Sequence, residues 1–86
     1  MSRPEDGALI AALEVQYREL GALLARLRRA RRELIPDPAA HWRGAARRAH
    51  DAAVDALARA VDEAIAAGQC ARERTGAAIA QVNSRA

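Results

Sequence analysis

The sequence has 86 residues, and although 51% are hydrophobic, alanine supplies much of that share and the aromatic residues are one Trp and one Tyr. Its 14 arginines and 11 acidic residues leave a net charge of +3, too small an excess to demand a nucleic acid or an anionic membrane as partner. No apolar run is long enough to cross a bilayer, and the N-terminus lacks the apolar stretch of a signal peptide. We therefore expect one small helical domain over residues 1–86, made in the cytoplasm, without membrane insertion, and with a core so thin that a partner completes it.

The first predicted helix covers about residues 6–34, and its apolar residues recur with the heptad spacing of a coiled-coil seam. The seam residues are Ile10, Leu13, Tyr17, Leu20, Leu24, Leu27 and Leu34. Leu9 and Leu23 lie beside this seam and widen the apolar stripe, so we expect this helix to contact neighbours on two sides. Arg31 interrupts the seam near the helix end, where a cluster of arginines complements the negative end of the helix dipole.

The predicted bend covers about residues 35–44 and begins with the run Ile-Pro-Asp-Pro. Pro36 disfavours helix in the residue before it, and Asp37 followed by Pro38 is typical of the start of a new helix. Because a short connection between long helices makes them antiparallel neighbours, the chain is expected to reverse here.

The second predicted helix begins at about residue 39 or 45 and ends at about 82. Its predicted seam is narrow and consists of Val54, Leu57, Val61, Ala64, Gly68, Ala71, Thr75, Ala78 and Val82, with Ile65 and Ile79 beside it. Since this helix is the longer of the two, we expect its C-terminal end, with Ile79 and Val82, to overhang the hairpin, and either to fray or to be covered by a second chain. The predicted fold is all-α, an antiparallel two-helix hairpin that pairs with another hairpin into a four-helix bundle.

The bend also carries the motif Trp42-Arg43-Gly44. A large ring at this place can close the open end of a helix pair, and a glycine lets a neighbouring group approach without meeting a Cβ. A Trp-x-Gly between two long helices resembles the WXG-hundred family, the small substrates of type VII (ESX) secretion. The resemblance covers most of the chain as an architecture and continues in the spacing of the apolar residues of the second helix, whereas the motif itself is short.

The resemblance implies that this chain is a type VII secretion substrate or a substrate-pairing subunit that acts through dimerisation and not as an enzyme. The implied partner is a second copy, another small Trp-x-Gly protein or the helical N-terminal region of a larger secreted protein, and a membrane ATPase complex would export the folded pair. The family often carries Tyr-x-x-x-Asp/Glu after its second helix as an export signal, but this chain ends in Asn-Ser-Arg-Ala. The signal is therefore expected on the partner, or this chain is a family-like subunit that is not itself export-competent.

Other residue patterns indicate no catalytic, cofactor or metal site. His50, Asp51 and Asp55 have a spacing compatible with a metal, but such residues are usual on a charged helix surface. Cys70 excludes an intrachain disulfide and is interpreted as a small helical residue. Two rival hypotheses stay open: an intracellular helical-hairpin adaptor or antitoxin-like protein that masks an acidic partner, and, more weakly, a nucleic-acid binder that uses the arginines of residues 26–32.

Overall fold

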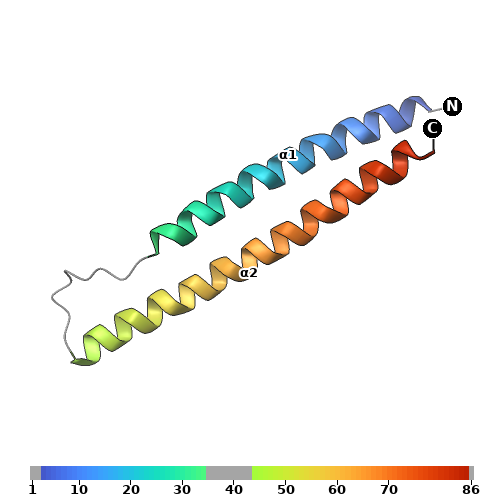
Figure 1. Cartoon of the computed structure of the whole chain (residues 1–86). Coiled ribbons are helices and arrows are strands. Elements are labelled where there is room, and N and C mark those ends of the chain that lie inside the picture. Colours follow the sequence, from blue (N-terminus) through green and yellow to red (C-terminus); the bar gives the residue numbers. More distant parts are fainter. Residues whose placement is uncertain (1–2, 35–43, 86) are drawn as a thin grey trace.

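The computed structural model describes residues 3–34 and 44–85 as two long helices, α1 (Pro4–Glu33) and α2 (Gly44–Asn83). The helices run antiparallel and side by side, and the start of α1 lies beside the end of α2 (Figure 1). The predicted fold class, an all-α helical hairpin, is thereby confirmed. The molecule is a thin rod, with extents of 68 × 15 × 13 Å.

Local sequence signals account for the ends of the helices. Pro4 stands in the first turn of α1, where its missing N–H is not needed, and Glu5 and Asp6 place negative charge at the positive end of the helix dipole. At the other end of α1 the Leu34 N–H donates to the Arg31 carbonyl. Residues 35–43, on which most of the predicted bend falls, lie outside the described residues.

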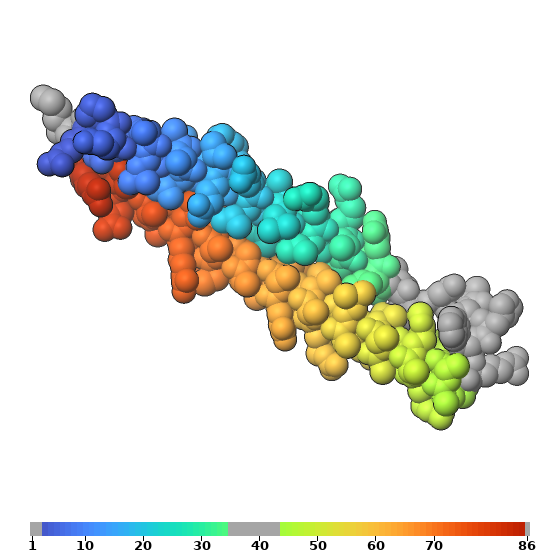
Figure 2. Space-filling model, turned by 180° about the vertical axis from the view of Figure 1, so that it is seen from behind, coloured from blue at the N-terminus to red at the C-terminus, as the bar shows by residue number. Residues whose placement is uncertain are grey.

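The interior of the rod is a single seam in which the spacing alternates between three and four residues in both helices. The buried or half-buried seam residues of α1 are Ile10, Leu13, Tyr17, Leu20, Leu24, Leu27, Arg31 and Leu34, and those of α2 are Val54, Ala58, Val61, Ile65, Gly68, Arg72, Thr75, Ile79 and Val82. Among the described apolar residues only Leu24 and Val82 are buried, with 3% and 6% of their surface exposed. The two helices thus cover one stripe of each other and leave most of their surfaces in solvent, as the thin rod in Figure 2 also shows.

The unpaired part of the longer helix lies at the bend and not at the chain ends. Val82 is 6% exposed, and the ion pair between Arg85 and Asp6, 4.0 Å from Nη1 to Oδ1, joins the turn that follows α2 to the first turn of α1. The prediction that the C-terminal end of helix two overhangs the hairpin was therefore wrong. The N-terminal part of α2 extends past the end of α1 instead (Figure 1), because the 40 residues of α2 pair with only 30 in α1.

Candidate interaction surface

Three glycines in the seam region each lie beside a large side chain of the opposite helix. A Cβ added to Gly68 would lie 2.9 Å from Leu24 Cδ2, and one added to Gly21 would lie 3.0 Å from Arg72 Nη2. A Cβ at Gly76 would make an ordinary contact with the Tyr17 ring, at 3.4 Å. The missing side chains make room for the large ones, so these glycines act as packing holes and not as helix breaks.

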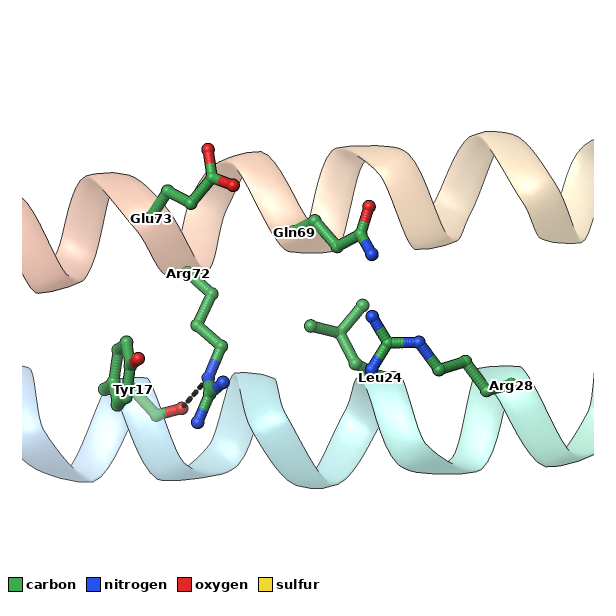
Figure 3. A pocket seen from close by; sticks show the side chains of 6 residues that line it. All are labelled: Tyr17, Leu24, Arg28, Gln69, Arg72 and Glu73. Atoms are coloured by element: carbon green, nitrogen blue, oxygen red, sulfur yellow. Dashed lines mark hydrogen bonds between the residues drawn. The ribbon is translucent and has the colours of Figure 1, made fainter.

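Arg72 occupies a seam position that a hydrophobic residue would normally fill. Its guanidinium carbon lies 4.0 Å from the centre of the Tyr17 ring, and its Nε donates to the Tyr17 carbonyl over 3.3 Å (Figure 3). The aliphatic part of an arginine side chain can cover apolar surface while the guanidinium stacks on an aromatic face. One arginine therefore crosses from α2 to α1 and holds the middle of the hairpin together.

A second polar contact crosses the seam one turn further along α2. The Gln16 side chain donates from Nε2 to Thr75 Oγ1 over 2.9 Å, and the Thr75 hydroxyl donates to the Ala71 carbonyl, also over 2.9 Å. Thr75 is only 4% exposed, so these bonds satisfy a hydroxyl that would otherwise be buried without a partner.

The seam residues predicted for α1 are all buried or half-buried, whereas two residues of one row predicted for α2 are exposed. Val54, Val61, Ile65 and Ile79 lie in the seam, together with Gly68, Thr75 and Val82. Leu57 is 52% exposed and lies outside the seam, and Ala64 is exposed as well. Ala58, Ile65, Arg72 and Ile79 fill the seam one position after the predicted row. The last two residues of that row, Ala71 and Ala78, are half-buried beside Arg72 and Ile79.

The row predicted for α2 belongs to an apolar surface on one flank of the seam, which we call the open face. On α1 it carries Leu9, Gln16 and Leu23, and on α2 it carries Leu57, Ala64, Ala71 and Ala78. Gln16, Ala71 and Ala78 line the same groove between the helices, which shows that the two rows share one flank. Leu9, Leu23 and Leu57 are 43%, 39% and 52% exposed, so the face offers large apolar side chains to solvent.

Next to this groove, α1 alone forms a shallow hollow of about 410 Å³ on the open face. Leu20 and Leu23 line it together with Gln16 and Ala22, and Glu19 and Arg26 lie at its edges. The other flank of the seam is polar by contrast: the hollow drawn in Figure 3 is lined by Tyr17, Leu24, Arg28, Gln69, Arg72 and Glu73. The hairpin therefore has one apolar and one polar flank.

Of the predicted bend motif, the structure describes only Gly44, the first residue of α2; Trp42 lies outside the described residues. Gly44 has a φ of +60°, a left-handed conformation that costs other residues about 1–2 kcal/mol. A Cβ at Gly44 would meet no atom of the described residues within 4 Å. Within that part of the chain, the glycine is needed for its backbone conformation and not for close approach.

The remaining residues discussed above form no further site in the described part of the chain. Residues 3–34 and 44–85 contain no group of three His, Cys, Asp or Glu residues that could hold a metal ion. Asp51 accepts from Arg47 in a half-buried pair with an N–O distance of 3.3 Å, and Cys70 is exposed and unpaired. In the same ranges neither helix is apolar enough over a sufficient length to span a bilayer.

Comparison with known proteins gives no relative: no family model, no curated protein and no solved structure matches the chain.

Proposed function

We propose that this chain is a pairing subunit, a WXG-type type VII secretion substrate or the companion of one, whose open face docks on another helical hairpin. The observation that supports pairing is the difference between the seam, which buries few apolar residues, and the open face, which leaves large ones exposed. The seam buries only Leu24 and Val82 among the described apolar residues, whereas Leu9, Leu23 and Leu57 stay exposed on one flank. Two hairpins that pack their apolar flanks together cover these side chains and give a four-helix bundle with a core of ordinary thickness.

The assignment to secretion rests on the motif at the bend. Trp42-Arg43-Gly44 resembles the WXG-hundred signature, and the φ of +60° at Gly44 supports a conformational reason for a glycine at the start of α2. We propose that the secretion ATPase recognises the pair and not the single chain.

The test uses the chain together with the product of a neighbouring gene that encodes a second small Trp-x-Gly protein or a larger protein with an N-terminal hairpin. We expect the chain to reach the culture medium only when the ATPase of the type VII system is intact. Export that persists without that ATPase would refute the secretion role. A chain that forms a pair but stays in the cell would instead favour an intracellular adaptor.

A matched pair of substitutions tests the open face separately from the fold. Leu23→Glu places a charge in the apolar face and is expected to abolish pairing in light scattering, because the charge would have to lose its water. Ala25→Glu adds the same side chain at an exposed position two residues away, outside the seam and the open face, and is expected to leave pairing intact. Equal behaviour of the two variants would show that the face is misassigned.

A further inference from the structure

Contacts across the seam give the two helices a common scale along the rod. Leu24 lies beside Gly68, Tyr17 beside Gly76, Arg31 beside Asp62 and Asp6 beside Arg85. In each contact the two residue numbers add to 91–93, so an α2 residue lies level with the α1 residue whose number is about 92 minus its own. On this scale Leu57 lies level with the C-terminal end of α1, about one residue past Leu34.

The three exposed leucines of the open face are spaced nearly symmetrically along this scale. Leu9 precedes Leu23 by 14 residues, which is about 21 Å at 1.5 Å per residue. Leu57 lies about 12 positions beyond Leu23 in the opposite direction, or about 18 Å. If a second hairpin is turned end for end about a two-fold axis between Ala22 and Leu23, its Leu57 therefore arrives at the level of Leu9, and the reverse also holds.

Two charges of the open face have the same symmetry. Glu19 and Arg26 lie on either side of Leu23 at the edges of the hollow on α1. The residues one turn away from each in α1 include no opposite charge, and no ion pair joins either of them to another described residue. The same two-fold axis places Glu19 opposite Arg26 of the second copy and Arg26 opposite Glu19 of the second copy.

We propose that a second copy of this chain occupies the open face, with its α1 antiparallel across α1 and the two-fold axis beside Leu23. The leucines and the charges select this register independently, and their axes agree within about one residue. In this register the two rods overlap over about 37 residue levels, or about 55 Å, so a face 15 Å wide offers about 830 Å², close to the roughly 800 Å² that each partner of a standard interface buries. This inference rests on the proposed pairing function and specifies its partner and geometry.

Docking of two copies with their bends at the same end does not bring the exposed leucines or the two charges together. If the second copy docked with its bend at the same end, α1 would face α2 of the copy, and Leu9 would stay about 26 positions away from the level of Leu57. Arg26 would then face the level of Ala66 and Ala67 and remain without a partner. The antiparallel register is the one that brings Leu57 of the copy to the level of Leu9 and pairs both charges.

The first experiment exchanges the two charges and measures the oligomeric state of the full chain by sedimentation velocity at low salt. Glu19→Arg alone and Arg26→Glu alone each create two like-charge contacts per dimer, so each is expected to weaken the homodimer at least about tenfold. The double variant with both changes should dimerise like the wild type. An equimolar mixture of the two single variants should form a heterodimer, because every contact then pairs opposite charges.

The second experiment locates the axis with a cysteine. In a Cys70→Ala background, Leu23→Cys should form a disulfide-linked dimer under mild oxidation, because the two copies of position 23 meet at the axis. Ala25→Cys, exposed and off the open face, is the matched control and should crosslink much more slowly.

The outcomes separate this inference from the function on which it rests. A wild-type chain that stays monomeric alone at high micromolar concentration, or a double variant that fails to regain dimerisation, overturns the register proposed here. A chain that is monomeric alone but pairs with the product of a neighbouring gene would refute the self-association and leave the pairing function in place. A chain that pairs with neither would refute both.

Discussion

The packing of Leu24 against Gly68 can be tested by a double-mutant cycle. Leu24→Ala removes three carbon atoms from the most buried side chain of the described residues, which is 3% exposed. At about 0.8 kcal/mol per carbon the transfer term alone is about 2.4 kcal/mol. Because Gly68 has no side chain to refill the space, a cavity term adds to this, and we expect a loss of about 3 kcal/mol in the free energy of unfolding.

The second arm of the cycle is Gly68→Ala. In the wild type the new Cβ would lie 2.9 Å from Leu24 Cδ2, so overpacking of about 1–3 kcal/mol outweighs the gain in helix propensity of about 1 kcal/mol. In the Leu24→Ala background this obstacle is gone, and the same change should stabilise the chain by about 1 kcal/mol. The expected coupling between the two positions is therefore about 2 kcal/mol.

The assay is urea unfolding followed by far-UV circular dichroism, repeated at several protein concentrations because association adds apparent stability. Val15→Ala serves as the control, since Val15 is 43% exposed and lies outside both the seam and the open face, and it should change the unfolding free energy by less than about 0.5 kcal/mol. Strict additivity of the two substitutions, or a cost of Leu24→Ala below about 1 kcal/mol, would refute the knob-and-hole packing described for this pair.

Further substitutions test one backbone conformation and two contacts by the same unfolding assay. Gly44→Ala should destabilise the chain by about 1 kcal/mol because alanine tolerates a φ of +60° poorly, and no loss would show that this conformation is not required. Arg72→Gln should lose about 1–2 kcal/mol by removing the stacking on Tyr17 and the bond to its carbonyl, and Arg72→Lys should recover only part of it; full recovery by lysine would mean that charge alone matters. Asp62→Asn should cost at most about 0.5 kcal/mol, because its pair with Arg31 is exposed, and a larger loss would contradict that assessment.

The first helix could be predicted from its sequence because its leucines stand out from their surroundings. Leu13, Leu20 and Leu27 recur at intervals of seven, and large apolar residues are scarce elsewhere on that helix apart from Leu9, Val15 and Leu23. Arg31 falls in the same row as Ile10, Tyr17 and Leu24, and the sequence predicts that it interrupts the seam. In the structure Arg31 keeps its seam position and donates from Nε to Asp62 Oδ1 over 2.9 Å at the rim.

The second helix was harder to predict because alanine fills several of its rows. The row of Leu57, Ala64, Ala71 and Ala78 contains no charge, whereas the row that actually packs contains Arg72, so apolar character alone favoured the wrong one. The spacing of Ile65 and Ile79, 14 residues apart with Arg72 midway, was the signal that could have corrected it. A sequence pattern does not show that Arg72 stacks on the Tyr17 ring, because that contact depends on the register of the two helices.

The position of the unpaired end was mispredicted for a related reason. Comparing helix lengths shows that one helix must extend past the other, but not at which end. The contacts of Gly68 with Leu24 and of Arg85 with Asp6 fix the answer, and they depend on side-chain shape and not on periodicity.

The three glycine holes also have a mechanical consequence. Their occupants differ, since Leu24, Tyr17 and Arg72 have different sizes and Arg72 enters from the opposite helix. A slip of one helix past the other by seven residues would move each large side chain out of its hole and against a neighbour that has a Cβ. The hairpin therefore resists sliding of one helix along the other. Tension applied along the rod is expected to unfold it in one step, without intermediate registers.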